Sequence, residues 1–416
     1  MWIQKIKEAD FLKVSTYLIK WLLYGSVVGA LTGALSTLFL NSLATVTELR
    51  INYTFLLYFL PVAGALISYS YLKFGKNAVR GNNLVIEQAN GGTERVPFRL
   101  IPLTLIGTLA THLFGGSAGR EGTAVQMGGA TADFVGRLFK INQKERRILI
   151  ICGMSAGFSS VFGTPIAGTL FALEVLALGI FREEALFPSL WAALVANWMA
   201  IYLGATHTHY SMGNIPTTTV TLVIKLMFAA ILFGLTGRLF SRLTDYLKNK
   251  WKEWFPNPVL KSFLGGSFII VLVLLLGTRD YLGLSLPLLQ QAFSGDSAPY
   301  AFILKLLFTS VTLSTGFQGG EVTPLFVMGA TLGSTLAPIL GISIPFLAGL
   351  GFIGVFAGAT NTPIACFIMG LELFGTDALP YLFLICVISY LFSGNSGIYE
   401  SQLIHIKKAT LFEMNE

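Results

Sequence analysis

The residue with the clearest chemical potential in this sequence is Glu121, which stands between Arg120 and Gly122 at the start of a short apolar segment. Flanking glycines leave a carboxylate there few neighbours other than backbone N–H groups. The first N–H groups of a helix have no partner within the helix, and the helix dipole places about half a positive charge beside them. Such a terminus attracts a carboxylate and a small free anion alike. The pattern predicts that Glu121 competes with free anions for one site.

Glu121 is also a candidate proton carrier. A helix terminus stabilises an anion by about 0.3–1 kcal/mol, up to roughly 2 kcal/mol when partly buried, whereas burial of an unpaired charge costs several. Burial therefore favours the neutral form of a carboxyl group. A glutamate that takes up a proton releases the N–H donors to a free anion, so one side chain would couple the two ions. The alternative is a glutamate that pairs with Arg120 and faces water.

Other polar residues near glycines are candidate donors for an anion. Asn82 and Asn83 follow Gly81 in a predicted loop and carry amide N–H groups without a fixed charge, although an Asn-Asn pair is also typical of an ordinary turn. Tyr399 follows Gly397 near the end of the last apolar segment. Its hydroxyl would either donate to an anion or anchor the chain at the membrane interface.

Histidine and cysteine patterns indicate no metal or redox site. His207 and His209 lack further ligands nearby in the sequence. His112 lies in an apolar run, where packing is a simpler role than proton relay. No motif spacing connects the three cysteines, Cys152, Cys366 and Cys386. We expect neither a metal nor a cofactor.

The elements that must position these residues are membrane-spanning helices. Of the 416 residues, 54% are hydrophobic and 12% are charged, and the mean hydropathy is +0.69, which excludes a water-soluble globule. Crossing about 30 Å of hydrocarbon takes about 20 apolar residues, and such runs recur between Val14 and Ser393. Barrel strands alternate apolar and polar residues, whereas runs such as 268–276 are continuously apolar, so a transmembrane barrel is excluded. The fold class predicted is an all-α polytopic membrane protein.

The charge distribution predicts orientation rather than a polyanionic partner. The formal net charge is +7, but the basic residues lie in short connectors, so nucleic-acid binding is not indicated. Basic residues before the first long span predict a cytoplasmic N-terminus: Lys5, Lys7, Lys13 and Lys20. Residues 1–15 mix charged and apolar side chains and predict an amphipathic cytoplasmic helix.

The sequence repeats itself in two halves. Gly119-Arg120-Glu121-Gly122-Thr123 is echoed by Gly319-Gly320-Glu321-Val322-Thr323, and Thr164-Pro165-Ile166-Ala167 by Thr362-Pro363-Ile364-Ala365. Glu174 and Glu372 follow the Thr-Pro segments at matching distances, which favours a structural role such as capping a neighbouring helix. Valine and threonine follow Glu321, so it is not the chemical equivalent of Glu121.

Repeated segments interrupted by glycine and proline are typical of transporters whose site lies where two related halves meet. The segments after Glu121, Gly163, Val322 and Asn361 are predicted to be too short or broken for a full crossing. We interpret 248–254 as a loop between halves at about 16–247 and 256–400. Together these form a single transmembrane domain, 16–416, with a short cytoplasmic C-terminal tail.

These motifs resemble the CLC family of chloride channels and anion/proton exchangers, from about Val14 to Ser401. Residues 119–122 match the family's Gly-Arg-Glu-Gly-Pro except that Thr123 replaces proline, and 320–324 stand at its Gly-x-Phe-x-Pro position. The resemblance implies inverted repeats with broken and tilted helices, a homodimer with one pathway per subunit, and Glu121 as the gating glutamate. It also implies anion-binding roles for Asn82, Asn83, Gly119, Arg120, Gly122, Val322, Thr323 and Tyr399.

Departures from the family pattern resemble its bacterial fluoride/proton antiporter branch. The chloride-selecting loop Gly-Ser-Gly-Ile-Pro is replaced by residues 81–85, Gly-Asn-Asn-Leu-Val, and Val322 stands where phenylalanine is usual. Fluoride holds its water more tightly than chloride, so short, strong hydrogen bonds must replace that water, and Asn82, Asn83 and Thr323 are plausible donors. Val175 occupies the position of the inner proton-transfer glutamate of chloride exchangers, so the sequence indicates no proton route on the cytoplasmic side.

The resemblance implies a secondary active transporter that exports fluoride in exchange for protons across the bacterial cell membrane. Its partners would be fluoride, protons and the lipid bilayer, with chloride as a further candidate ion. A chloride/proton exchanger and a passive anion channel are the alternatives within the family. An enzyme is not expected, because no nucleophile with a base, metal pattern or paired acidic site is visible.

Overall fold

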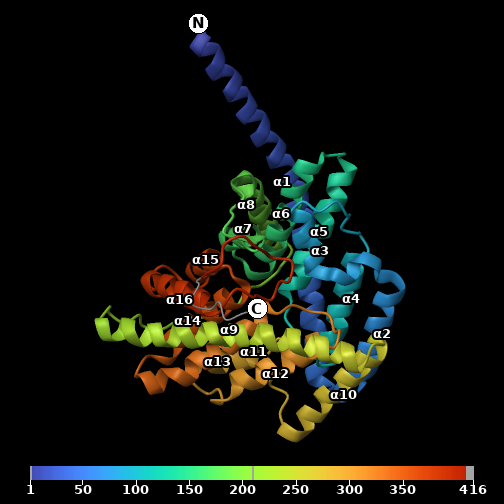
Figure 1. Cartoon of the computed structure of the whole chain (residues 1–416), viewed down its shortest axis with the longest axis vertical. Helices are drawn as coiled ribbons and strands as arrows, with labels where there is room; N and C mark the ends of the chain where they lie inside the picture. Colours follow the sequence, from blue (N-terminus) through green and yellow to red (C-terminus); the bar gives the residue numbers. More distant parts are fainter. Residues whose placement is uncertain (1, 209, 409–416) are drawn as a thin grey trace.

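The computed structural model describes the backbone of residues 2–208 and 210–408, with side chains from Lys13 onward. The chain is almost entirely helical (Figure 1). The first elements are α1 (Trp2–Asn52), η1 (Thr54–Phe59), α2 (Leu60–Ser70), η2 (Tyr71–Gly75), η3 (Lys76–Arg80), α3 (Gly81–Ala89), α4 (Leu100–Leu113), α5 (Glu121–Leu138), α6 (Gln143–Phe162), α7 (Pro165–Glu174), β1 (Ala177–Leu178), η4 (Glu183–Ala185) and α8 (Leu186–Tyr202).

The later elements follow the same order of long and short helices. They are α9 (Val220–Trp254), α10 (Pro258–Leu276), α11 (Leu286–Ser294), α12 (Ala301–Ser314), α13 (Val322–Leu340), α14 (Ile344–Thr360), α15 (Pro363–Phe374), α16 (Leu379–Phe392) and β2 (Leu403–Ile404). β1 and β2 form a short parallel pair that ties the end of the chain to the segment after α7.

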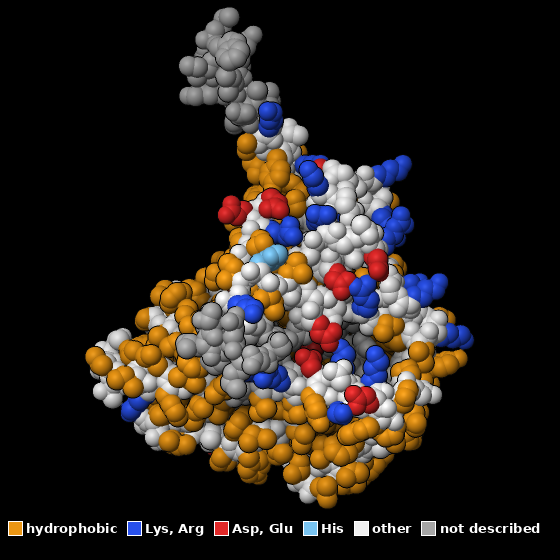
Figure 2. Space-filling view, in the orientation of Figure 1, with side chains coloured by type: hydrophobic (Ala, Val, Ile, Leu, Met, Phe, Trp, Pro, Cys, Tyr) orange, Lys and Arg blue, Asp and Glu red, His pale blue; other side chains and the backbone are white. Residues whose placement is uncertain are grey.

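The surface fits a lipid environment. Within the described residues, six helices are long and apolar enough to cross a membrane. In Figure 2, hydrophobic side chains cover the lower part of the molecule, while charged side chains gather in its upper and central parts. In water such a surface would be unfavourable, whereas in a bilayer it faces a solvent of matching polarity. The chain is therefore an all-α polytopic membrane protein, as predicted.

Glycines allow close packing of α5 on α6 in the first half and of α13 on α14 in the second. A Cβ atom on Gly128 of α5 would lie 2.0 Å from the Gly153 carbonyl oxygen of α6, and one on Gly329 of α13 would lie 2.0 Å from the Gly351 carbonyl oxygen of α14. The helices can approach this closely only because these residues have no side chain. Gly128 and Gly329 follow Met127 and Met328 at matching positions of the two halves, so the same packing contact occurs in both.

The two short helices that follow the Thr-Pro motifs cap each other. Glu174, at the end of α7, accepts the N–H groups of Ile364 (3.1 Å) and Ala365 (2.8 Å) at the start of α15. Since each terminus has unpaired N–H groups and a positive dipole end, a carboxylate stabilises it.

Glu372, near the end of α15, returns this contact. It accepts the N–H groups of Ile166 (3.0 Å) and Ala167 (2.8 Å) at the start of α7. The capping role predicted for both glutamates is confirmed. Because equivalent helices run antiparallel, the two halves are inverted relative to each other.

The prediction that 248–254 forms a loop is wrong. These residues are the last turns of α9, and the chain leaves the helix only at Phe255. Lysines and tryptophans are compatible with helix, so polarity alone did not mark a break. Since α5 and α7 correspond to α13 and α15, the helix order makes α9 the counterpart of α1. We therefore propose that the second half begins at α9 rather than near residue 256.

The chain ends are only partly described. α1 is one continuous helix from Trp2, so the predicted 1–15 segment is not a separate element. Its amphipathic character depends on side chains that, up to residue 12, lie outside the described residues. The last part of the predicted C-terminal tail, 409–416, also lies outside them.

Removing one of the reciprocal caps is expected to lower stability. Glu372→Ala leaves two N–H groups at the start of α7 without their carboxylate. The free energy of unfolding should fall by roughly 0.5–2 kcal/mol. We expect a lower melting temperature of the purified protein in detergent. Glu183→Ala, which removes an exposed carboxylate, is the control. Equal melting temperatures for the two variants would contradict the capping role.

Candidate functional site

The site forms where the starts of α5 and α13 face each other. Gly119 N donates to Gly320 O (2.6 Å) and Gly320 N donates to Gly119 O (2.9 Å), so the two repeated motifs make an antiparallel bridge. A Cβ atom on Gly119 would lie 2.7 Å from a carboxylate oxygen of Glu121 and 2.9 Å from Gly320 O. Only glycine fits there, which explains the motif before Glu121.

Glu121 points across this junction into the start of α13. Its Oε2 accepts hydrogen bonds from the backbone N–H groups of Arg120 (3.0 Å) and Thr323 (3.2 Å), and its Oε1 accepts the Thr323 hydroxyl. The side chain is 1% exposed. The alternative is therefore wrong in that Glu121 does not face water, whereas its pairing with Arg120 is present as a long ion pair, with Arg120 Nε 3.9 Å from Oε1.

This arrangement places the Glu121 carboxylate on donors that would also suit a free anion. The donors are two backbone N–H groups and one hydroxyl at helix starts, which would serve a small anion equally well. No lysine or arginine neutralises the carboxylate at direct hydrogen-bond distance among the described side chains. The negative charge is thus held mainly by groups that a competing anion can also use.

Two cavities approach Glu121. The larger, of about 180 Å³, is lined by residues of α3, α5, α9 and the segment after α16, including Gln126, Glu321 and Tyr399. The smaller, of about 40 Å³, is lined by Arg120 and Thr323 among others. Glu121 lines neither cavity, but it contacts residues of the smaller one and lies beside the 319–321 segment that borders the larger one. It thus stands between them.

The predicted loop of Asn82 and Asn83 is instead the first turn of helix α3, which is a correction. The start of a helix suits an anion site for the same reason as α5 and α13 do. The Asn82 amide nitrogen lies so close to Gly122 that a Cβ atom there would be 2.8 Å away, and Asn82 Oδ1 is buried without a partner. Asn82 is therefore beside Glu121, whereas the Asn83 amide donates to Glu400 Oε2 (3.4 Å).

The remaining predicted residues gather around the same junction. Val322 begins α13 and is buried, and Tyr399 is buried and lines the larger cavity with both asparagines. Glu321 also lines that cavity, whereas Glu121 does not. The two glutamates thus lie in different surroundings, in agreement with the prediction that they are not chemically equivalent.

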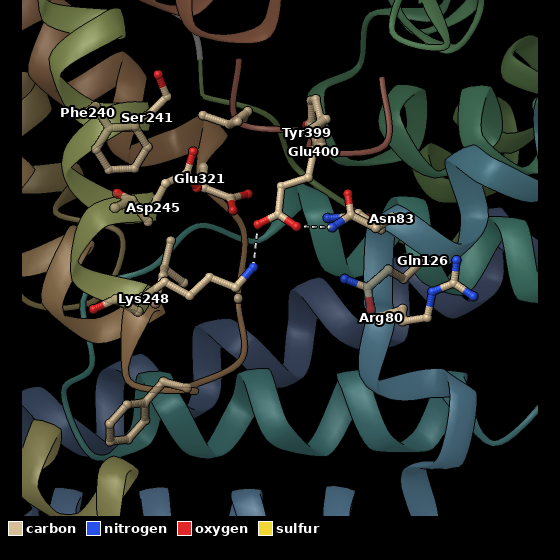
Figure 3. A pocket seen from close by; sticks show the side chains of 17 residues that line it. Arg80, Asn83, Gln126, Phe240, Ser241, Asp245, Lys248, Glu321, Tyr399 and Glu400 are labelled. Atoms are coloured by element: carbon tan, nitrogen blue, oxygen red, sulfur yellow. Dashed lines mark hydrogen bonds and ion pairs between the residues drawn. The ribbon is translucent and has the colours of Figure 1, made fainter. Parts of the chain in front are cut away.

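Sequence reasoning missed several polar residues of the larger cavity. Among them, Gln126, Lys248 and Glu400 line it together with Asn83 (Figure 3). Lys248 was not predicted because its segment was interpreted as a loop. Glu400 could have been predicted from the sequence, because it directly follows the candidate residue Tyr399.

The structure places most of the residues considered as metal ligands or proton relays. No group of three or more potential ligands that could hold a metal occurs among the described residues. His112 is fully buried, which agrees with a packing role; Nε2 lies 3.4 Å from Gly119 O, whereas Nδ1 has no hydrogen-bond partner. His209 lies outside the described residues.

Fold and site together define a class: a polytopic membrane protein of two inverted halves, with a buried carboxylate bound to N–H and O–H donors where the helix starts meet. Comparison with known proteins names the family. The model of the voltage gated chloride channel family matches residues 63–394. The chain belongs to this family, the CLC proteins.

Relatives within the family differ in their names. A "Chloride/fluoride channel protein" of Pseudomonas syringae pv. tomato is 44% identical over 97% of this chain and 90% of its own length. A "H(+)/Cl(-) exchange transporter ClcA" of Yersinia pestis is 24% identical over 85% of this chain and 80% of its own.

Solved structures share the fold. The crystal structure of a CLC-type fluoride/proton antiporter superposes with a TM-score of 0.91 at 38% identity, covering 93% of this chain and 98% of that one. A slow cyanobacterial Cl−/H+ antiporter gives a TM-score of 0.78 at 21% identity, over 91% and 96% of the two chains, which shows the fold alone.

Proposed function

We propose that this protein exchanges fluoride for protons, with Glu121 both as the gate and as the proton carrier. The observation that carries the proposal is the position of the Glu121 carboxylate, buried on the donors of Arg120 and Thr323 at the start of α13. The similarity to a fluoride/proton antiporter over almost the full chain supports fluoride as the anion.

The exchange follows from competition for these donors. The ionised carboxylate fills the site and separates the two cavities. A protonated carboxyl group has lost the charge that the donors stabilise, so fluoride displaces it and takes the N–H and O–H groups of Thr323. When fluoride leaves, the carboxyl group releases its proton and returns to the site. Each cycle moves the two ions in opposite directions.

Fluoride selectivity is assigned to donors at the start of α3 and α13. Fluoride is compact and strongly hydrated, so the site must replace its water with several short hydrogen bonds. Thr323 offers two donors, and Asn82 offers an amide beside Gly122. The alternative is a chloride/proton exchanger or a passive channel, and the name of the Pseudomonas relative mentions both chloride and "channel".

The anion is tested with reconstituted vesicles loaded with either halide. We expect fluoride efflux to be much faster than chloride efflux at equal gradients and clamped voltage. Chloride efflux as fast as fluoride efflux would contradict the assignment of fluoride.

Asn82→Ser is expected to weaken the discrimination against chloride. Asn82 would donate to either halide, so its loss changes the flux ratio only by the difference in strength between the two hydrogen bonds, and we expect the fluoride-to-chloride ratio to fall about three- to tenfold. The measurement is the ratio of initial efflux rates in the two halides. Asn77→Ser is the matched control, since the Asn77 amide donates to Arg95 O (3.1 Å) and Asn77 lines neither cavity. An unchanged ratio in Asn82→Ser would remove that residue from the selectivity argument.

We also propose that the N-terminus and the mouth of the larger cavity face the cytoplasm of a bacterial cell. Basic residues that belong to one face support this orientation: Lys20 pairs with Glu145, Arg146 donates to Glu94 O, and Arg80 pairs with Glu94. The chain's resemblance to its family supports a homodimer with one pathway per subunit. We expect no catalysis of covalent chemistry, and hydrolysis by the purified protein would contradict that expectation.

A further inference from the structure

The mouth of the larger cavity is crossed by a second carboxylate (Figure 3). Glu400 belongs to the segment after α16 and lies between α3 on one side and α9 on the other. Its Oε1 accepts a hydrogen bond from Lys248 Nζ of α9 (2.5 Å), and its Oε2 accepts one from Asn83 Nδ2 of α3 (3.4 Å). One side chain therefore bridges the two walls of the cavity.

The bridge lies at the entrance rather than deep in the cavity. The side chains of Glu400 and Lys248 are each 51% exposed, whereas Tyr399 and Gln126, which line the same cavity, are buried. The bridge therefore lies at the surface end of the cavity, next to the donors that an entering anion would meet first. Lys248 and the Asn83 amide would attract an anion there, and both already donate to Glu400.

The bridge is suited to repeated opening. Ion pairs between exposed side chains are weak, because water screens them and ordering two long side chains costs entropy. The backbone around Glu400 does not depend on it: Ser401 N donates to Asn83 Oδ1 (3.3 Å) and Ser401 Oγ donates to Glu87 (2.9 Å). The carboxylate can therefore leave Lys248 while its segment stays in place.

We propose that Glu400 is the gate at the cytoplasmic mouth, where its carboxylate competes with the entering anion for Lys248 and Asn83. This inference deepens the proposed function and rests on it. Glu121, between the two cavities, and Glu400, at the mouth of the larger one, then act in the same way: each is a tethered anion that occupies the donors the free anion needs. The charged groups around Glu400 in the cavity are Lys248, Arg80, Asp245 and Glu321.

The test measures access to the cavity without measuring transport. Ser241 lines the cavity, and its replacement by cysteine places a thiol behind the mouth. The native cysteines are all buried and give little background: Cys152, Cys366 and Cys386. The probe is the anionic reagent 2-sulfonatoethyl methanethiosulfonate, and the observable is its labelling rate on the full-length protein in detergent.

Glu400→Gln keeps the size of the side chain and removes its charge. We expect it to speed labelling of Ser241→Cys about three- to fivefold, the range that corresponds to an exposed ion pair. In a Lys248→Met background, the same change should alter the labelling rate less than about twofold, because the ammonium group for which Glu400 and the anionic reagent compete is absent. Glu253→Gln is the control, since Glu253 forms a comparable pair with Lys250 (2.7 Å) on α9, and Glu253 does not line the cavity.

Two results would overturn the gate. One is labelling of Glu400→Gln no faster than that of Glu253→Gln. The other is equal acceleration with and without Lys248, which would mean that Glu400 only adds local charge. Labelling requires no fluoride or proton movement, so a failed exchange measurement with normal labelling would refute the proposed function and not the bridge.

Discussion

Replacement of Glu121 by glutamine abolishes the proton flux that a fluoride gradient drives. Glutamine fills nearly the same space, so the junction between α5 and α13 keeps its packing, but an amide cannot take up and release a proton near neutral pH. In vesicles with a clamped membrane voltage, we expect the fluoride-driven pH change to fall to that of protein-free vesicles.

The Glu121→Gln result separates exchange from passive conduction. A channel in which Glu121 is only structural predicts nearly intact transport in this variant. Glu183→Gln, which neutralises an exposed carboxylate at the end of the β1–α8 connection, is the control for reconstitution. A Glu121→Gln protein that still moves protons under a fluoride gradient would show that another group carries the proton.

Thr323→Val should weaken the apparent affinity for fluoride about tenfold to a hundredfold. Valine has the shape of threonine but lacks the hydroxyl that donates to the Glu121 carboxylate. A hydrogen bond to a charged acceptor contributes about 1.5–3 kcal/mol, which corresponds to that range. The measurement is the dependence of the initial flux on fluoride concentration.

Thr331→Val is the matched control for Thr323→Val. Thr331 lies in the same helix and is equally inaccessible, but its hydroxyl donates to Val327 O within the helix (2.6 Å). We expect its fluoride dependence to stay close to that of the wild type. Equal losses in the two variants would mean that the effect comes from packing of α13 and not from a donor at the site.

Much of the fold and of the site follows from local sequence rules. Apolar length predicted most of the spans, and the repeated glycine motifs predicted the junction because only glycine allows the backbones of residues 119 and 320 to pair. The matching positions of Glu174 and Glu372 predicted capping. Each of these inferences needed only residue type and spacing along the chain.

Inferences that depended on distant neighbours were less successful. Polarity suggested a loop at 248–254, yet the helix continues, and our proposal that the halves divide before α9 needed the order of all the helices. The contacts of Asn83 with Glu400 and of Glu400 with Lys248 join three segments far apart in the chain. No local pattern marks such a cluster, although the adjacency of Glu400 to Tyr399 was a signal.

The central claim is tested most directly by the sign of the pH change outside vesicles loaded with fluoride. Exchange moves protons inward as fluoride leaves, so the exterior becomes alkaline even when the interior starts more acidic, with voltage held at zero by potassium and valinomycin. Permeation of hydrogen fluoride would carry protons outward and acidify the exterior instead. External alkalinisation against the proton gradient is the predicted result; fluoride efflux with no inward proton movement would contradict the account.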